Sequence, residues 1–329
     1  MIGKALILTA LVASAFAAIK QTPVIGIYTQ DSDYPGYEDF TYIASSYVKS
    51  MEMTGVQVVP IFYHYTTTQL QSLLGQLNGV VFPGGEMPID IGNQWTSNTK
   101  YILEFAMNQT NNGNPYPIWA TCLGYEALAV ITSQIKNNMS TLTRVHGEEG
   151  STRNLTITMQ NSKLFGTMAK NLLDEVTKGD GLYYFHHNWA VLTSTFRAST
   201  PLSNFWNLVS TSVSPAGEEF VSTLEAKNYP FFASQYHPEK NPYEWRIPAV
   251  RTYNAILIEQ WVFNIFAEGA RQNKNTFKSE DELKKLLIYN YQPLYTTPDY
   301  DFVQIYTFNE TSLIKEQMDR QQEQHLQTE

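Results

Sequence analysis

Short apolar runs alternate with amphipathic stretches along the first 130 residues of the chain. Four runs rich in β-branched and aromatic residues are typical of strands buried on both faces: 24–28, 56–59, 80–82 and 117–121. Three stretches between them place apolar residues at helical spacing: 42–54, 67–77 and 102–106. Gly55 follows the first of these as a helix stop, and Thr67 or Thr68 can cap the second. The pattern predicts an α/β fold with a mostly parallel central sheet and helices on both faces.

The second half of the chain has a looser pattern. Residues 154–159 alternate as a half-buried strand would, and three further strands are predicted at 183–185, 220–221 and 231–236. A long helix is predicted over 249–267, and the chain turns polar from Lys315 onward. We expect a single α/β domain over 19–312 and a polar C-terminal tail over 313–329.

The amino terminus is typical of a signal peptide. Lys4 precedes an apolar run of 14 residues over 5–18, which is shorter than the roughly 20 residues needed to span a bilayer. Small residues at Ala15 and Ala17 have the spacing that signal peptidase reads. The sequence therefore predicts a cleaved leader over 1–18, with a buried helix or an N-terminal anchor as the alternative. No other stretch reaches transmembrane length.

Four glycosylation sequons accompany this leader, and they begin at Asn108, Asn138, Asn154 and Asn309. Sequons occur by chance, so each is weak evidence alone. Together with the leader they favour the secretory pathway, with the lysosome or the extracellular space as the destination.

Composition narrows the class of protein. The chain has 329 residues, of which 43% are hydrophobic and 16% charged, so it can bury a large core and is neither disordered nor collagen-like. Its net charge is -9, which argues against a nucleic-acid partner because phosphate binding needs clustered Lys and Arg. Cys122 is the one cysteine, so no internal disulfide forms. No cluster has metal-ligand spacing, and we expect no metal and no other cofactor.

Cys122 stands at the first of three strand ends that carry unusual residues. It follows the strand 117–121 and is followed by Leu123 and Gly124, as in a nucleophile elbow, where a sharp turn exposes the side chain. The start of a helix would also favour the thiolate. The alternative is a buried structural cysteine.

The second strand end carries Gly84 and Gly85 after the strand 80–82. Adjacent glycines can turn backbone N–H groups toward the oxyanion of a tetrahedral intermediate, together with the N–H of Leu123. The alternative is an ordinary glycine turn.

The third strand end carries His237 and Glu239. His237 can take a proton from Cys122, and Glu239 can orient the imidazole through its other nitrogen. The alternative is a surface histidine in a turn that contains Pro238.

Together the three motifs resemble the class I glutamine amidotransferase-like hydrolases, and within that group the γ-glutamyl hydrolases. The likeness spans about residues 23–308, and the extension 240–245 after the histidine motif is especially similar to the γ-glutamyl hydrolases. Ala120 departs from the pattern, which usually has glycine two places before the cysteine.

The resemblance implies roles for individual residues: Cys122 as nucleophile, His237 as base, Glu239 as the third member, and Gly85 and Leu123 as oxyanion donors. It also places a histidine near the substrate, either His186 or His187, without deciding between them.

The activity that follows is a cysteine hydrolase that cleaves γ-glutamyl bonds of poly-γ-glutamates, such as folylpolyglutamates, through a thioester. Its partner is this small-molecule substrate, and a homodimer is compatible with the sequence. One alternative is a glutaminase-type amidotransferase subunit, against which the leader argues, as does Glu126, because synthetase glutaminases commonly carry Gln there. The other is an inactive γ-glutamyl-binding protein on the same fold. Endo or exo cleavage, chain length and the basic residues that bind the substrate carboxylates stay open.

Overall fold

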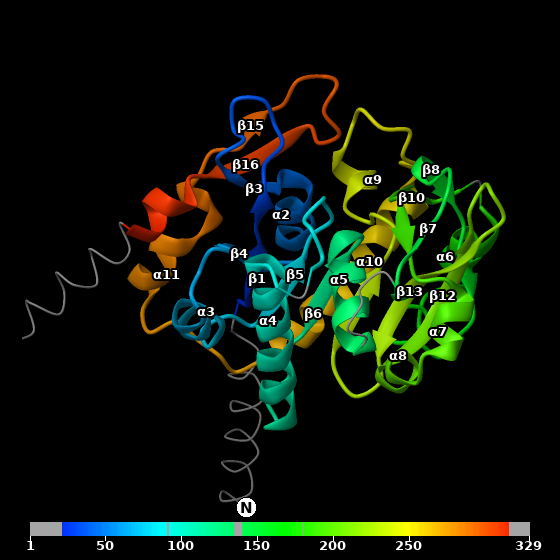
Figure 1. Ribbon diagram of the computed structural model, residues 1–329, viewed down its shortest axis with the longest axis horizontal. Helices are drawn as coiled ribbons and strands as arrows, with labels where there is room; N and C mark the ends of the chain where they lie inside the picture. Colours follow the sequence, from blue (N-terminus) through cyan, green and yellow to red (C-terminus); the bar gives the residue numbers. More distant parts are fainter. Residues whose placement is uncertain (1–21, 91, 135–139, 180, 316–329) are drawn as a thin grey trace, which may run out of the picture.

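The structure is a computed structural model that describes residues 22–90, 92–134, 140–179 and 181–315 (Figure 1). The predicted leader, the sequon at Asn138 and residues 316–329 of the predicted tail lie outside the described residues. Within the described ranges, no helix has both the length and the apolar character that a membrane crossing requires.

An eight-stranded sheet forms the centre of the molecule. Its strands, in spatial order, are β4 (Gln57–Ile61), β1 (Val24–Tyr28), β5 (Gly79–Phe82), β6 (Ile118–Thr121), β14 (Phe231–Ser234), β13 (Glu219–Ala226), β12 (Trp206–Val213) and β9 (Thr156–Ile157). The first five run parallel to one another. The last three continue the sheet as antiparallel strands. The predicted mostly parallel α/β sheet is therefore confirmed, with an antiparallel extension at one edge.

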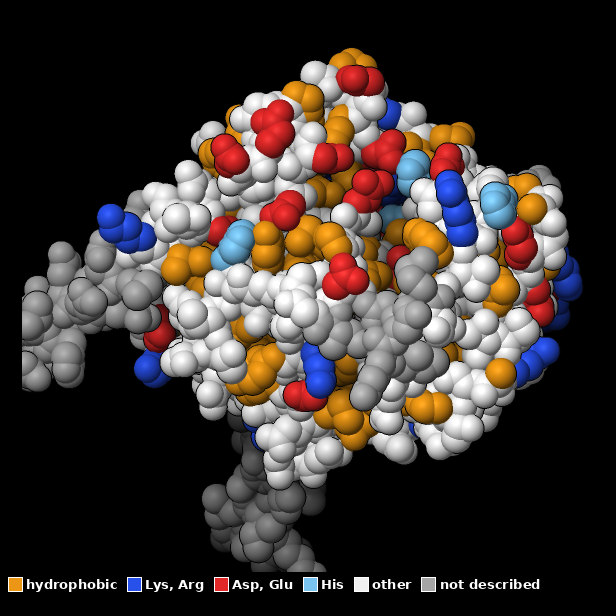
Figure 2. Space-filling view, viewed as in Figure 1, with side chains coloured by type: hydrophobic (Ala, Val, Ile, Leu, Met, Phe, Trp, Pro, Cys, Tyr) orange, Lys and Arg blue, Asp and Glu red, His pale blue; other side chains and the backbone are white. Residues whose placement is uncertain are grey.

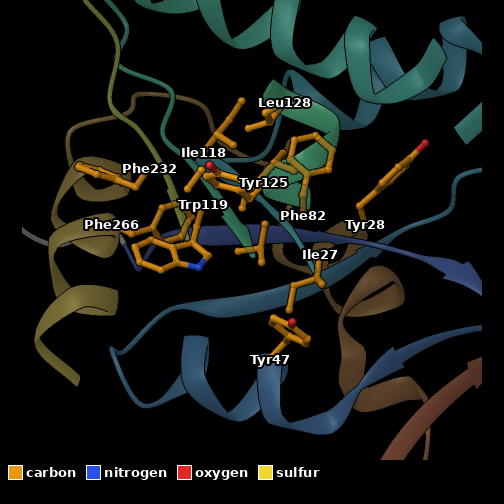
Figure 3. Packing of buried hydrophobic residues seen from close by; sticks show 14 of the residues in the cluster. Ile27, Tyr28, Tyr47, Phe82, Ile118, Trp119, Tyr125, Leu128, Phe232 and Phe266 are labelled. Carbon is orange, nitrogen blue, oxygen red and sulfur yellow. The ribbon is translucent and has the colours of Figure 1, made fainter. Parts of the chain in front are cut away.

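Helices cover both faces of this sheet. On one face α5 (Leu123–Ser133) contacts β5, β6 and β14, and α4 (Gln94–Asn111) lies between α5 and α3 (Thr67–Leu74). On the other face α2 (Ser45–Glu52) contacts β1 and β4 and packs against α10 (Tyr253–Arg271). Figure 3 shows Leu128 of α5 and Tyr47 of α2 on opposite sides of the strands. The remaining helices are α6 (Lys170–Lys178), α7 (Thr193–Ala198), α8 (Thr200–Phe205), α9 (Lys240–Tyr243), α11 (Glu280–Leu286) and the 3₁₀ turn η2 (Ile288–Asn290).

Three small antiparallel sheets supplement the central one. The largest has the order β15 (Leu294–Tyr295), β16 (Gln304–Phe308), β3 (Thr41–Ala44), β2 (Gln30–Asp31). The other two pair β10 (Tyr183–His186) with β8 (Glu149–Arg153), and β11 (Trp189–Ala190) with β7 (Thr143–Arg144). Because β2 begins two residues after β1 ends, the four-stranded sheet stands beyond the carboxyl end of a parallel strand, where α/β sites form.

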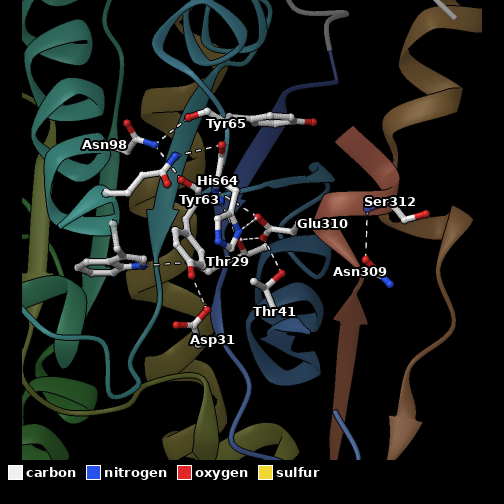
Figure 4. A network of polar contacts seen from close by, with 12 residues as sticks. Thr29, Asp31, Thr41, Tyr63, His64, Tyr65, Asn98, Asn309, Glu310 and Ser312 are labelled. Atoms are coloured by element: carbon white, nitrogen blue, oxygen red, sulfur yellow. Dashed lines mark hydrogen bonds and ion pairs between the residues drawn. The ribbon is translucent and has the colours of Figure 1, made fainter. Parts of the chain in front are cut away.

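A buried carboxylate ties the end of the described chain to this region (Figure 4). Glu310 accepts hydrogen bonds of 2.5 Å from the hydroxyls of Thr29 and Thr41. It also pairs with Nδ1 of His64 at 2.8 Å, and this carboxylate raises the pKa of the His64 imidazole. These contacts hold the segment after β16 against the carboxyl end of β1.

Several element boundaries differ from the sequence prediction. Helix α2 begins at Ser45, because residues Thr41–Ala44 form β3 and pair with β16 far along the chain. Helix α3 is capped by Thr66 and not by either predicted cap, Thr67 or Thr68. Helix α10 is capped by Thr252 and ends four residues beyond the prediction. Gly55 has a φ of +81°, which fits its prediction as a helix stop.

The antiparallel strands were the least visible in the sequence. Strand β9 covers two residues of the predicted strand 154–159. Of the eight-residue strand β13 the sequence prediction covered only residues 220–221, and it missed the eight-residue strand β12. Their buried positions include Ser210, Ser222 and Thr223, so neither strand has the apolar run or clean alternation that predicts one.

Candidate active site

Cys122 occupies a strained turn between β6 and α5. Its φ is +48° and its ψ -105°, a backbone conformation that non-glycine residues rarely adopt. The Cys122 N–H donates to the Ser234 carbonyl at 2.8 Å, and the Gly124 N–H donates to the Pro83 carbonyl at 3.2 Å. A Cβ on Gly124 would lie 2.5 Å from the Phe82 carbonyl oxygen, so glycine is needed there. The strands on both sides of β6 thus hold the elbow.

The departure at Ala120 is accommodated in β6. Ala120 is fully buried and pairs with Ala233 of β14 and Phe82 of β5. Its methyl group therefore belongs to the packed sheet, and the elbow forms with alanine at this position.

His237 follows β14 and is held by Glu239. Nδ1 of His237 lies 2.7 Å from Oε1 of Glu239, and both side chains are buried. The carboxylate accepts the Nδ1 proton, which leaves Nε2 as the unprotonated nitrogen. Nε2 is buried and has no hydrogen-bond partner among the described residues.

Gly84 lies between this imidazole and the cysteine. A Cβ on Gly84 would stand 2.7 Å from Cε1 of His237 and 3.1 Å from Cβ of Cys122. Any side chain at this position would therefore push the two groups apart. The three strand ends that the sequence singled out do meet in the structure.

The two glycines differ in their backbone hydrogen bonds. The Gly84 N–H donates to the Tyr47 hydroxyl at 2.7 Å, and its carbonyl accepts from Nε2 of Gln30 at 2.6 Å. A Cβ on Gly85 would overlap the Gln30 side chain, at 1.5 Å from Oε1. The N–H groups of Gly85 and Leu123 donate to no oxygen in the described part of the chain, and the Leu123 N–H instead lies against the Cys122 sulfur.

Burial decides the resting protonation of the Cys122–His237 pair. It raises the pKa of the Cys122 thiol well above its usual value and lowers the pKa of the His237 imidazole. The helix terminus was expected to favour the thiolate, but desolvation of the sulfur outweighs it. The resting pair is therefore a thiol and a neutral imidazole, and the thiol donates to the His186 carbonyl at 3.5 Å.

A cavity of about 1150 Å³ opens over Cys122 and His237. The face shown in Figure 2 is hollowed at a place where histidine and acidic side chains gather. The cavity is lined by the loops that follow β2, β5 and β15, and by the segment between β10 and β11. Among the residues that the structure describes, no group of three His, Cys, Asp or Glu side chains is arranged to hold a metal ion.

His186 and His187 both line this cavity. Nδ1 of His187 donates to the Trp189 carbonyl at 2.9 Å, and burial lowers the pKa of His187 to about 3. Its Nε2 is therefore a neutral acceptor, and no described residue bonds to it. His186 is more exposed, and its Nδ1 lies 3.6 Å from Oδ2 of Asp301.

Sequence reasoning missed the role of Lys240, although it directly follows the His-Pro-Glu motif. The side chain is 2% exposed, and its Nζ lies 4.6 Å from the ring centre of Phe302 and 3.9 Å from Oδ2 of Asp301. It supplies the only Lys or Arg side chain among the described residues that line the cavity. No periodicity or spacing signals this, because the aromatic ring and the carboxylate come from a distant loop.

Glu126 lines the same cavity, one helical turn after Cys122. Its Oε1 accepts from Nε2 of Gln235 at 3.0 Å. Burial raises the pKa of Glu126 to about 8, so its carboxyl is protonated at neutral pH and can act as a hydrogen-bond donor.

Comparison with known proteins places the chain in a family. The model of the peptidase C26 family matches residues 23–239. Gamma-glutamyl hydrolase B of Dictyostelium discoideum is 33% identical over 299 residues, which cover 88% of this chain and 84% of that protein. Gamma-glutamyl hydrolases of Rattus norvegicus and Homo sapiens are 32% and 31% identical, and each match covers 87% of this chain and 90% of the relative. With this coverage and the site geometry above, the chain belongs to the peptidase C26 family.

Proposed function

We propose that this protein is a cysteine hydrolase that cleaves γ-glutamyl bonds. The observation that carries the proposal is the unpartnered Nε2 of His237, whose ring is held by Glu239 and lies, like Cys122, within contact distance of a Cβ built on Gly84. Relatives with similarity over most of the chain are named gamma-glutamyl hydrolases. The resemblance to the γ-glutamyl hydrolases indicates poly-γ-glutamates, such as folylpolyglutamates, as the substrates.

Acylation starts from the neutral thiol. As the Cys122 sulfur attacks the γ-carbonyl carbon, Nε2 of His237 takes the thiol proton, and Glu239 stabilises the imidazolium that forms. The N–H groups of Gly85 and Leu123 donate hydrogen bonds to the oxyanion of the tetrahedral intermediate, while Gly84 supplies the space between base and nucleophile.

The end of acylation and the deacylation that follows pass the proton on through His237. The imidazolium of His237 protonates the leaving amine, and the acyl group stays on the sulfur as a thioester. The same nitrogen then removes a proton from water, which attacks the thioester and releases the γ-carboxylate and the thiol.

Three groups suit the γ-glutamyl unit itself. Lys240 provides a buried positive charge for the α-carboxylate. His187 offers Nε2 as a buried acceptor for an N–H of the substrate, and Glu126 offers a protonated carboxyl as a donor. All three line the cavity around Cys122.

We also propose that the protein enters the secretory pathway and reaches the lysosome or the extracellular space. The support is the sequence of residues 1–18 and the four sequons. A homodimer remains our proposal for its assembly, and light scattering of the purified mature chain tests it.

The decisive experiment compares two isomers, γ-Glu-Gln and α-Glu-Gln, with release of glutamate followed by mass spectrometry. We expect turnover of the γ isomer by the parent protein and none by the Cys122→Ala variant. Absence of turnover of the γ isomer, or equal turnover of both isomers, would overturn the proposed function.

A further inference from the structure

A short strand beside the central sheet reaches the turn that carries the Gly85 N–H. Strand β2 begins two residues after β1 ends, and its first residue, Gln30, is buried. Nε2 of Gln30 donates a hydrogen bond of 2.6 Å to the carbonyl oxygen of Gly84. Because a carbonyl oxygen only accepts hydrogen bonds, the side-chain atom that faces it is the amide nitrogen, which settles the orientation of this amide.

This hydrogen bond acts on the same peptide group that carries the Gly85 N–H. The Gly84 carbonyl and the Gly85 N–H are the two ends of one planar trans peptide, in which C=O and N–H point in opposite directions. Gln30 holds the carbonyl end, so the N–H end points away from Gln30. Gly85 lines the cavity together with Cys122, and its N–H donates to no oxygen among the described residues. Gln30 therefore sets the direction of a donor that has no partner in the resting site.

The contact between β2 and the turn is close. A Cβ on Gly85 would overlap the side-chain amide of Gln30, so this amide fills the space that any side chain at position 85 would need. A second contact joins the same two segments, since the Asp31 N–H lies 3.3 Å from Sδ of Met87. The turn after β5 is therefore packed directly against β2.

The four-stranded sheet gives Gln30 a rigid support. Strand β2 is the edge strand of this sheet, where Gln30 pairs with Tyr42 of β3. Strand β3 in turn pairs with β16, and Figure 1 shows these two strands side by side. Glu310, which follows β16, accepts hydrogen bonds from Thr29, directly before Gln30, and from Thr41 of β3. Segments from both ends of the described chain thus hold the backbone from which the Gln30 amide extends.

We propose that Gln30 is a positioning residue for the oxyanion hole. Its amide orients the peptide between Gly84 and Gly85 so that the Gly85 N–H stays directed at the oxygen of the tetrahedral intermediate. The bond to the carbonyl also polarises the peptide and strengthens its N–H as a donor. Negative charge develops on that oxygen only during the reaction, so Gln30 contributes to turnover and not to substrate binding. This inference rests on the proposed function and adds a residue to its machinery.

The first test is Gln30→Met, which removes the donor and keeps a side chain of similar length. With γ-Glu-Gln as substrate we expect kcat to fall about 10- to 100-fold while KM stays within about twofold. The loss is smaller than that for a deleted oxyanion donor, because the Gly85 N–H is still present and only its direction is less well fixed.

Alkylation of Cys122 by iodoacetamide separates this role from general damage to the site. Cys122 is the one cysteine of the chain, so uptake of the label reports on it alone. The sulfur displaces iodide from a saturated carbon and no oxyanion forms, so the rate depends on the thiol and on His237 but not on the Gly85 N–H. We expect equal alkylation rates in the parent and in Gln30→Met. A rate that falls as far as kcat would overturn the inference, because Gln30 would then support the nucleophile and base themselves.

A second variant, Gln30→Glu, matches the parent side chain in size and shape but reverses the interaction. An ionised carboxylate repels the Gly84 carbonyl oxygen and attracts the Gly85 N–H, which draws this donor away from the oxyanion. We expect a lower kcat in Gln30→Glu than in Gln30→Met at neutral pH, again with little change in KM. A kcat equal to that of the parent would overturn the inference. If Gln30→Met does not fold, Gln30→Glu carries the test alone.

The matched control is Asn98→Leu. The Asn98 side chain on α4 is also a buried amide, and it donates to the backbone carbonyls of Tyr63 and Tyr65 at 2.8 Å and 2.9 Å. It does not line the cavity. This variant should lose unfolding free energy, as Gln30→Met does, and keep its kcat. An equal loss of kcat in both variants would reduce Gln30 to a structural residue and overturn the inference.

The outcomes separate the two proposals. If the parent protein does not hydrolyse γ-Glu-Gln, the proposed function falls and this inference falls with it. If the parent hydrolyses γ-Glu-Gln and folded Gln30→Met retains its kcat within about twofold, only the inference is overturned.

Discussion

The backbone N–H of Gly84 donates a hydrogen bond of 2.7 Å to the hydroxyl of Tyr47. Tyr47 belongs to α2 on one face of the sheet, whereas Gly84 belongs to the turn that follows β5. The bond fixes this turn, and with it the N–H of Gly85 and the space between Cys122 and His237. A fully buried side chain of the core thus positions the active-site backbone.

Replacing Tyr47 by Phe should reduce both stability and turnover. The variant leaves the buried Gly84 N–H without an acceptor, which costs about 1–3 kcal/mol of unfolding free energy. We expect kcat to fall about tenfold, because the turn that carries the Gly85 N–H becomes less well fixed, while KM changes little. Denaturant unfolding and steady-state kinetics measure the two effects.

The matched control is Tyr116→Phe. The Tyr116 hydroxyl is also buried and donates to the Leu74 carbonyl at 3.1 Å, but it is outside the cavity lining. This variant should lose stability and keep its kcat. An equal loss of kcat in the two variants would show that Tyr47 acts through general stability alone.

Cys122→Ala should abolish turnover and leave the fold intact. The sulfur forms the thioester, and alanine occupies less space in the same buried turn. Loss of a nucleophile that acts together with its base reduces turnover by several orders of magnitude, here about 10⁴-fold or more. Residual activity within tenfold of the parent, with an unchanged circular dichroism spectrum, would remove Cys122 from this role.

Glu239→Ala should lower kcat by roughly 10- to 1000-fold, and His237→Ala should lower it more. Without the carboxylate at 2.7 Å, the imidazole loses its fixed tautomer and orientation but can still reach the sulfur part of the time. Parallel kinetics of the two variants test the order. An unchanged kcat in Glu239→Ala would make the site a Cys–His dyad with Glu239 as a structural turn residue.

Glu126 should make the folded protein more stable at acidic than at mildly alkaline pH. Burial raises its pKa from 4.5 to about 8, so the folded state keeps a proton that the unfolded chain releases between these values. The contribution of this group to the unfolding free energy therefore falls as the pH rises through that window.

Glu126→Gln removes this titration. Between about pH 6 and pH 8 the variant should gain about 2 kcal/mol of unfolding free energy relative to the parent, at 1.4 kcal/mol for each pH unit. Urea unfolding of both proteins at the two pH values measures the difference. A constant offset between them would show that Glu126 is ionised in the folded protein throughout.

The mature chain should begin near Ala18 or Ile19 and carry N-glycans at Asn108 and Asn309. Both side chains are exposed. Asn154 is half-buried; its amide nitrogen donates to the Gly179 carbonyl, and its Oδ1 accepts from the N–H of Gly181 at 3.1 Å, so a glycan there would displace both contacts. Peptide mass spectrometry of secreted protein, with and without glycosidase, tests this. An intact Met1 without any glycan would contradict the secretory proposal.

Local pattern was sufficient for the parallel half of the sheet and for the three strand ends of the site. Strands β1, β5 and β6 are short apolar runs, and β5 and β6 end directly before Pro83 and Cys122, so each signal lies within a few residues. The pairing of His237 with Glu239 was also predictable, because two residues in one turn meet without help from the rest of the chain.

The tertiary structure alone decided the elements and contacts that join distant segments. Residues 42–44 belong to the predicted helix over 42–54 but form part of β3, because pairing with β16 satisfies their backbone groups. Tyr47 has the periodicity of a core residue, and only packing brings its hydroxyl to Gly84.

The distribution of charge around the cavity is also decided by the tertiary structure. A net charge of -9 does not show where the charges lie, and folding brings acidic residues of separate segments together in the cavity lining that contains the buried Lys240. Sequence therefore determined which groups do the chemistry, since their geometry is set by local turns. The electrostatic environment of the cavity arises only when segments more than 200 residues apart pack together, because electrostatic interaction depends on distance in space and not on separation along the chain.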